Sequence, residues 1–181
     1  MKKFIIAAVF AFLPTLIFAQ QSVFDKFEDV DAITTVVVTK KMFQMMGNVQ
    51  LDKKDKEAQQ FLSLTKKLNN LRVFTTSNSK HASDMKATAE KHLKSAGLEE
   101  LMRVKDGGQN IRILVKSGAK ETQIKELLMF IEGGNVSTGK ANETILLSLT
   151  GDFDLDDLSI LTEKMNLPGG SALSKGSKGK K

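Results

Sequence analysis

The pattern of apolar positions gives its clearest strand signal at residues 33–39, which read ITTVVVT. β-Branched residues favour strands, and three consecutive valines are typical of a strand that is buried on both faces. We therefore expect a central strand here. Directly after it, Met42, Phe43, Met45 and Met46 recur at helical spacing and predict a helix over residues 41–46.

Two longer helices are predicted from apolar residues that recur every three or four positions. The first covers residues 55–68. The second begins within residues 77–79 and ends before Gly97, a glycine of the kind that terminates helices. Between the two helices, residues 71–76 (LRVFTT) predict a short strand.

The second half of the chain is rich in strand signals. Residues 98–105 and 111–116 flank the turn sequence DGGQN, which has the composition of a hairpin. Residues 124–132 (IKELLMFIE) fit a helical stripe as well as a strand. We expect a strand, because residues 144–150 (TILLSLT) form the next one and need an antiparallel neighbour. A last helix is predicted over residues 155–165.

These elements predict an α+β fold with a mostly antiparallel sheet of five to six strands and about three helices on one face. A ferredoxin-like arrangement, or an elaboration of it, is the closest known type. The length of 181 residues suits one such domain. We expect a cleaved signal peptide over residues 1–19, a single α+β domain over 20–168 and a disordered tail over 169–181.

The expectation of export rests on the N-terminal residues. Lys2 and Lys3 precede an apolar run over residues 4–18, and Ala19 follows it. The run is shorter than the roughly 20 apolar residues that a membrane-spanning helix needs, and its flanks are typical of a secretory signal. We therefore expect a periplasmic or secreted protein with no membrane span after cleavage; an uncleaved N-terminal anchor is the alternative.

Composition excludes several kinds of chemistry. The chain has no Cys, which excludes disulfides, thiol nucleophiles and Cys-ligated zinc or iron–sulfur sites. The net charge of +6 comes from the ends, because positions 20–174 hold 21 basic and 21 acidic residues. With three Arg and no Tyr or Trp, nucleic acid is not an expected partner. The Gly/Ser/Lys tail could touch anionic surfaces weakly, or could simply be a solubilising end.

Candidate catalytic groups are few. His81 and His92 share one predicted helix but lie about 16 Å apart along its axis, too far to bind one metal. His81 with Asp84 could form half a metal site, although an ordinary surface or cap histidine is the simpler interpretation. No G-x-S-x-G, P-loop or dinucleotide motif occurs. We assign no catalytic residue; carboxylates such as Asp25, Asp29 and Asp31 could converge only in the folded protein.

Two clusters resemble metal sites. Thioether groups suit Cu(I), but the spacing of Met42, Met45 and Met46 also packs an apolar helix face, and we expect them in the core. The acids Asp152, Asp154, Asp156 and Glu163 fall at positions 1, 3, 5 and 12 of an EF-hand-like loop, but its sixth position is not glycine.

The alternative for the acidic run is a helix start, with Asp154 as N-cap and Asp157 in the first turn. The carboxylates would then be stabilised by the helix end rather than by an ion. We assign no metal and no cofactor; the acidic run is only a weak cation candidate.

Three segments together resemble one known family. They are FDKFEDVDAITTVVVTKKMFQMM at residues 24–46, IRILVK at 111–116 and ILLSLTGDFDLDDLSIL at 145–161. They are similar to the exported bacterial family catalogued as domain of unknown function 4252. The resemblance implies a small exported one-domain protein and supplies no activity or site residue. Lipid anchoring, which occurs in such relatives, does not carry over because it requires a Cys.

The sequence therefore favours a non-enzymatic envelope or periplasmic protein that acts as an interaction or structural module for an unidentified envelope macromolecule. A carrier of a small apolar ligand, trapped between sheet and helices, is one alternative. A hydrolase whose carboxylates converge in the fold is the other.

We predict that the exported protein begins near Gln20. Mass spectrometry of the intact protein from its native host measures this directly. A mass that retains residues 1–19 would contradict the leader assignment.

Overall fold

The computed structural model describes residues 22–48, 55–106, 108–120, 122–133, 142–154 and 157. Several expectations lie outside these residues. They are the leader over 1–19, the tail over 169–181 and, apart from residue 157, the helix over 155–165.

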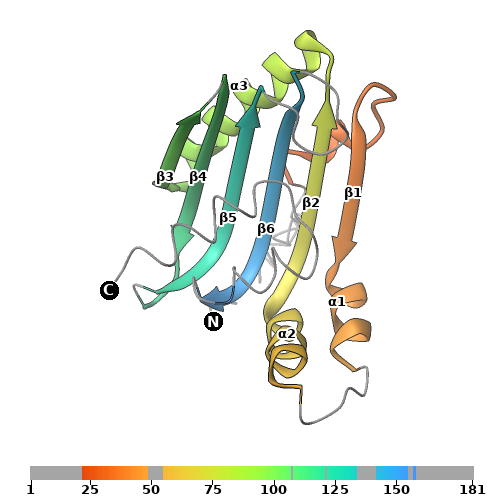
Figure 1. Ribbon diagram of the computed structural model, residues 1–181, viewed down its shortest axis with the longest axis vertical. Helices are drawn as coiled ribbons and strands as arrows, with labels where there is room; N and C mark the ends of the chain where they lie inside the picture. The colour runs from red at the N-terminus through yellow and green to blue at the C-terminus, as the bar shows by residue number, and fades with distance from the viewer. Residues whose placement is uncertain are drawn as a thin grey trace, which may run out of the picture.

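Six antiparallel strands form one sheet in the order β1-β2-β6-β5-β4-β3 (Figure 1). The elements, in chain order, are a short 3-10 helix η1(Asp25–Phe27), β1(Thr34–Thr39), α1(Lys40–Gly47), α2(Lys56–Lys67), β2(Leu68–Thr76), α3(Ser79–Ala96), β3(Glu99–Asp106), β4(Gln109–Ser117), β5(Gln123–Glu132) and β6(Thr144–Asp154). The predicted α+β class is confirmed, and residues 124–132 form a strand. The chain order of helices and strands differs from the ferredoxin-like βαββαβ order.

The helix ends follow from local chemistry. The Asp55 side chain accepts a hydrogen bond from the Ala58 N–H at 2.9 Å and caps α2. The Asn78 side chain accepts from the N–H groups of Lys80 and His81 and caps α3. Gly97 ends α3 in the left-handed conformation with φ +67°, as the sequence predicts.

Helix α2 continues into β2 without a connecting loop. Leu68 is both the C-cap of α2 and the first residue of β2. Gly151 of β6 pairs with Leu68, and a Cβ at position 151 would lie 2.6 Å from the Lys67 carbonyl oxygen. A glycine is therefore required where β6 passes the end of α2.

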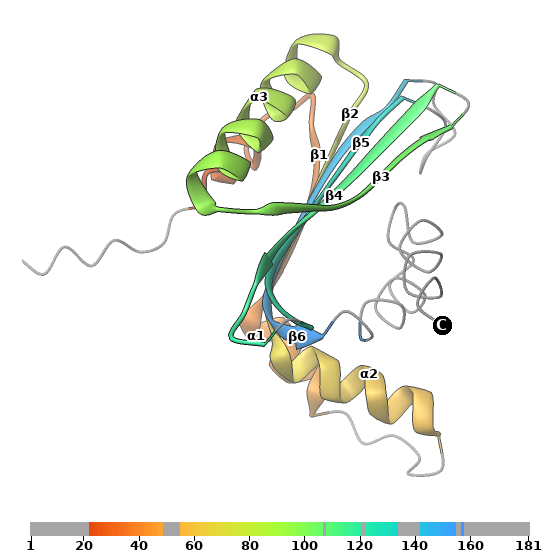
Figure 2. The same ribbon diagram turned by 90° about the vertical axis from the view of Figure 1, so that its left-hand side faces the viewer.

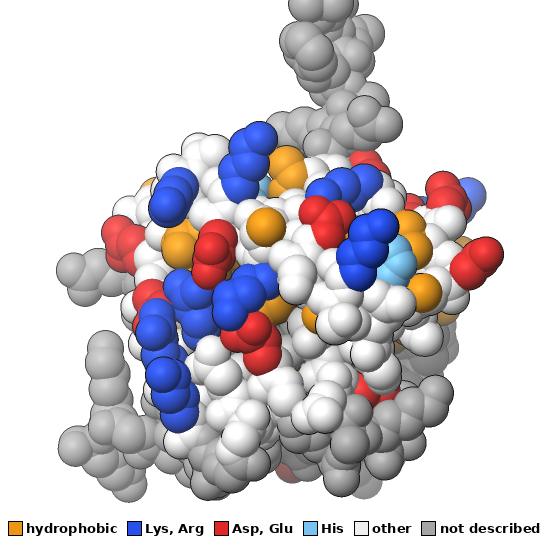
Figure 3. Space-filling model, turned by 90° about the horizontal axis from the view of Figure 1, so that it is seen from above, with side chains coloured by type: hydrophobic (Ala, Val, Ile, Leu, Met, Phe, Trp, Pro, Cys, Tyr) orange, Lys and Arg blue, Asp and Glu red, His pale blue; other side chains and the backbone are white. Residues whose placement is uncertain are grey.

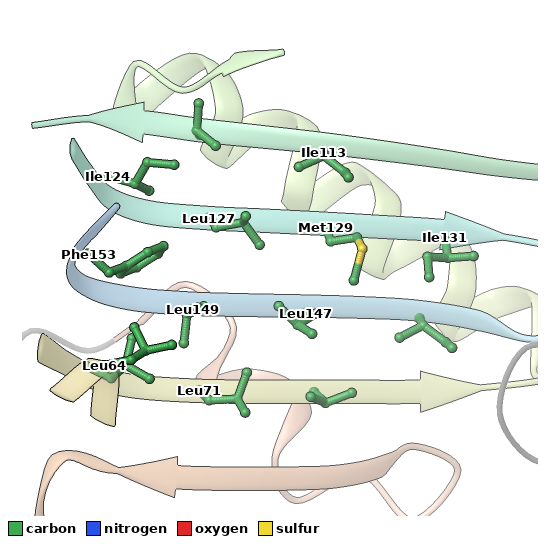
Figure 4. Packing of buried hydrophobic residues seen from close by; sticks show 14 of the residues in the cluster. Leu64, Leu71, Ile113, Ile124, Leu127, Met129, Ile131, Leu147, Leu149 and Phe153 are labelled. Carbon is green, nitrogen blue, oxygen red and sulfur yellow. The ribbon is translucent and has the colours of Figure 1, made fainter. Parts of the chain in front are cut away.

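The sheet is apolar on both faces. The first face carries the larger cluster, which contains Leu71, Val73, Ile111, Ile113, Val115, Ile124, Leu127, Met129, Ile131, Ile145, Leu147, Leu149 and Phe153. Figure 4 shows part of this cluster, with Leu71, Leu147 and Met129 on three neighbouring strands. Phe43 of α1 and Leu64 of α2 join this cluster. The second face packs against α3 and η1 through Phe24, Phe27, Ile33, Phe74, Met85, Ala89, Leu98, Leu114, Leu128, Phe130 and Leu146.

The helices therefore do not share one face, and that part of the prediction is wrong. Helix α3 lies against the second face, whereas α1 and α2 lie at the far end of the sheet and contribute to the first (Figure 2). The physical reason is that residues 127–131 and 144–149 are all buried. Strands with unbroken apolar runs need cover on both sides.

The expected central position of the first strand is also wrong. Within the described residues, β1 pairs only with β2 and forms one edge of the sheet. Val36 is 50% exposed and Val37 is 39% exposed. The run of valines is typical of an interior strand. However, β2 has β6 as its other neighbour, so β1 lies at the end of the strand order.

Because both faces of β6 are buried, truncating a side chain there should be costly. Leu147 is 1% exposed, so Leu147→Ala should lower the free energy of unfolding by about 2–5 kcal/mol. Leu101, which is 46% exposed on β3, provides the matched control, and Leu101→Ala should change it by less than about 0.5 kcal/mol. Urea unfolding measures both. Equal losses would contradict the burial described above.

Candidate interaction surface

Exposed apolar side chains occur along β1 and α1, two consecutive elements at one edge of the sheet. Six large apolar residues among those described are substantially exposed, and four of them are Val36, Val37, Met42 and Met45. Met42 is 47% and Met45 is 56% exposed. We call these four side chains, with the free edge of β1, the β1–α1 surface. Clustered exposed apolar groups mark interaction sites more often than scattered ones do.

The direct connection between β1 and α1 causes this exposure. α1 begins at Lys40, immediately after Thr39 ends β1. Phe43 is fully buried and Met46 packs against the first-face cluster, which fixes the orientation of the helix. Met42 and Met45 are left outside, so the prediction that they belong to the core is wrong. Packing in the core therefore explains the position of Met46 but not those of Met42 and Met45.

The two edges of the sheet differ in charge. β1 (TTVVVT) contains no charged residue, whereas β3 (EELMRVKD) is mostly charged. On β3, Arg103 donates to Glu100 at 2.6 Å, and Arg112 of β4 lies 3.1 Å from the same carboxylate. Hydrogen bonding from Arg103, followed by that from Arg112, lowers the pKa of Glu100. Charged edges discourage pairing with another strand, and β1 lacks this protection.

The carboxylates near the start of the described chain do not converge as a group. Asp25 Oδ1 lies 2.9 Å from Arg72 Nη2, and Arg72 Nε donates to Glu28 Oε1 at 2.8 Å. Arg72 is only 17% exposed, so this ion-pair network holds η1 to β2. Asp29 and Asp31 are exposed and precede β1 in the chain.

His92 and Glu126 form a pair that the sequence did not reveal. His92 Nε2 lies 2.7 Å from Glu126 Oε1, and both side chains are mostly buried between α3 and β5. In this contact Nε2 is the ring nitrogen that faces the carboxylate. Nδ1 is buried and has no hydrogen-bond partner in the described part of the chain. The ring also packs edge-on against Phe24, with 5.2 Å between centroids.

The His92–Glu126 contact joins α3 to β5 and does not expose the imidazole as a general base. In a carboxylate–imidazole pair, the nitrogen that does not face the carboxylate is the one that acts on a substrate. Here that nitrogen is Nδ1, which is inaccessible. The pair therefore fastens α3 to β5. A sequence search could find it only by knowing that residues 34 positions apart meet across the second face.

The candidate metal ligand next to the other histidine, His81, is already used in an ion pair. Asp84, its candidate partner, forms an ion pair with Lys26 at 3.0 Å. The backbone N–H of His81 donates to the Asn78 side chain at the start of α3. Over the described ranges, no three His, Cys, Asp or Glu residues are grouped so that they could hold a metal ion.

The acidic run at the end of β6 is paired with lysines. Asp152 lies 2.9 Å from Lys125 and also accepts from the Gln123 side chain. The Lys125 hydrogen bond is the main cause that lowers the pKa of Asp152. Asp156 and Glu163, the other two members of the candidate cation cluster, lie outside the described residues.

Lys67 joins the end of this run to α2. Its Nζ lies 2.8 Å from Asp157 Oδ2 and 3.6 Å from Asp154 Oδ2, and the hydrogen bond to Asp157 raises the pKa of Lys67. The Asp154 N–H donates to Asp157 Oδ2 at 3.2 Å. This is the contact that a first-turn carboxylate makes with an N-cap residue.

Two other parts of the described surface offer less. Seen from above, basic and acidic side chains lie next to one another with scattered apolar groups between them (Figure 3). A recess between α3 and the sheet, lined by Lys86, Glu90, Arg112 and Phe130 among others, has a volume of about 10 Å³. That volume holds at most one water. Within the described segments, no helix is both long and apolar enough to cross a bilayer.

We predict that calcium does not stabilise the protein at millimolar concentration. Asp152 and Asp154 already face Lys125 and Lys67, whose positive charges would have to be displaced by the ion. Thermal melting during a calcium titration measures the effect. A saturable rise in Tm that disappears when Asp152→Ala and Asp154→Ala are combined would establish a cation site.

Comparison with protein families places the chain in a family. The family model described as Domain of unknown function (DUF4252) matches residues 27–161, about three quarters of the chain. Searches among curated proteins and among solved structures found no match. The match spans every strand of the sheet, η1 at its last residue and all three α-helices. The chain therefore belongs to the DUF4252 family.

Proposed function

We propose that this protein is an exported, non-catalytic module of the cell envelope that binds another macromolecule through the β1–α1 surface. The observation that carries the proposal is the concentration of exposed apolar side chains, from Val36 to Met45, at one edge of the sheet. The lysine–apolar–alanine leader supports the assignment to an exported protein.

Two properties make this edge suitable for binding. β1 offers a row of backbone N–H and C=O groups to an added strand. The exposed valines and methionines provide apolar area beside that row, and burying it is favourable by about 25 cal/mol per Å². The backbone groups give affinity to any extended partner, while the side chains determine which partner fits.

The arrangement of polar groups supports a non-catalytic role. Arg72 pairs with Asp25 and Glu28, and Glu126 pairs with the buried ring of His92. Each of these pairs links two elements of the fold. The groups are therefore used to fix η1 and α3 on the sheet, which is a structural use of residues that would suit acid–base chemistry.

The alternative of a carrier for a small apolar ligand finds no support in the recess between α3 and the sheet. At about 10 Å³ it is far smaller than the pockets of roughly 300–1,000 Å³ that bind small molecules. The second-face side chains around it, Leu114 and Phe130, are buried by packing against α3.

Site-specific photo-crosslinking in the native envelope tests the proposal. A photoreactive amino acid at position 37 or 45 should give a reproducible adduct with a macromolecule. The same amino acid at Leu101, equally exposed on the opposite edge, should give little or none. Each variant should keep the melting temperature of the parent, since all three positions are exposed.

Adducts of equal yield from positions 37, 45 and 101 would indicate random collisions and contradict the proposal. Absence of any adduct from positions 37 and 45 would contradict it as well.

A further inference from the structure

We infer that Met42 and Met45 form a reversible oxidation site, at which hydrogen peroxide converts the thioethers to sulfoxides and thereby switches off binding at the β1–α1 surface. This inference rests on the proposed function and adds a regulation to it. The chemistry has two requirements. The thioethers must be accessible to the oxidant, and the apolar area they supply must contribute to binding.

The fold separates these two methionines from the others that the structure describes. Met42 is 47% exposed and Met45 is 56% exposed. The other methionines of the described ranges are buried in a core cluster or packed against one: Met46, Met85, Met102 and Met129. A peroxide in solution therefore meets the first two side chains directly, whereas it reaches a buried one only when the protein opens locally.

The orientation of α1 keeps both thioethers on its outer side. Phe43 is fully buried and Met46 packs against the first-face cluster, so turning the helix to cover Met42 or Met45 would expose the phenylalanine ring. Side chains three positions apart are neighbours on a helix surface. The two methionines therefore form one oxidisable patch on α1, which follows the end of β1 (Figure 1).

The reaction is a two-electron oxidation of sulfur. A lone pair of Sδ attacks one oxygen of the peroxide, the O–O bond breaks, an S–O bond forms and water leaves. The chain has no Cys, so no thiolate of its own competes for the peroxide. A methionine sulfoxide reductase reverses the change with a dithiol as reductant: the sulfoxide oxygen leaves as water and the dithiol becomes a disulfide.

The product changes what the surface offers to a partner. A sulfoxide is polar, so burying it against apolar groups carries a desolvation cost that the thioether does not have. Val36 and Val37 have no sulfur to oxidise, and the backbone groups of β1 are unaffected. Because neither methionine packs in the core, oxidation should weaken binding without unfolding the domain.

Peptide mapping after brief exposure to hydrogen peroxide tests the oxidation site. One or two oxygen atoms should be added to the tryptic peptide that begins at Met42, and fragmentation should place them on Met42 and Met45. Met85 and Met129 should react at least about tenfold more slowly, because both are buried in core clusters. The melting temperature should stay unchanged. Reaction at Met85 or Met129 as fast as at Met42 would overturn the site.

Photo-crosslinking from position 37 tests the switch. Purified exported protein with the photoreactive amino acid at this position is oxidised, freed of peroxide and then added to envelopes of the native host. Oxidation should lower the yield of the adduct by about tenfold. Treatment of the oxidised protein with a methionine sulfoxide reductase and dithiol should restore the yield.

Two matched variants assign the effect to these sulfur atoms. Met42→Leu combined with Met45→Leu keeps the apolar volume and removes both thioethers, so its adduct yield should resist peroxide. Met102→Leu removes a partly buried methionine on β3, far along the strand order from β1, and its yield should fall like that of the parent. All variants should crosslink like the parent before oxidation.

An adduct yield that oxidation leaves unchanged would overturn the switch, and so would an equal fall in the parent and in the double leucine variant. In both cases the proposed function stands, because the unoxidised protein still crosslinks. If the unoxidised protein gives no adduct, the proposed function fails and the switch falls with it. The peptide map then still decides whether Met42 and Met45 are the oxidation site.

Discussion

The burial of β5 and β6 on both faces is the constraint from which the rest of the architecture follows. Residues 127–131 of β5 are all buried, so both faces of the strand are shielded from solvent. Neighbouring strands must protect its backbone, and side chains from helices must cover both faces. β6 is held between β5 and β2, while α3 covers the second face and α1 and α2 contribute to the first. This arrangement leaves β1 and β3 as the outermost strands.

Three of the polar contacts described above hold these layers together. Arg72, His92 and Lys67 each join elements that are far apart in the sequence, namely η1 to β2, α3 to β5 and α2 to the end of β6. The difference between the two edges then becomes the most informative feature of the surface. β3 carries charges that repel an added strand, whereas β1 carries only valines and threonines. If selection had acted against the addition of strands at both edges, we would expect charged residues on both β1 and β3.

The elements could be predicted from the sequence because their signals are local. Asp55, Asn78 and Gly97 mark helix ends through their own backbone and side-chain chemistry, and they do so in the structure. Strand order is not local, so Val36 and Val37 gave an interior pattern for a strand that lies at an edge. The pairing of His92 with Glu126 was likewise hidden, since it depends on how α3 crosses β5. The exposure of Met45 depends on Phe43, because residues two positions apart lie on nearly opposite sides of a helix and Phe43 is the buried one.

The direct passage from α2 into β2 at Leu68 has a consequence for how this family can vary. Successive side chains are rotated by about 100° in a helix and by about 180° in a strand. One residue inserted at the junction would therefore rotate the buried faces of α2 and β2 relative to each other. Gly151 allows β6 to pass within contact distance of this point, where a Cβ would lie 2.6 Å from the Lys67 carbonyl oxygen. Insertions and deletions should therefore be excluded at the junction, which makes it a fixed reference point for aligning distant members of the family.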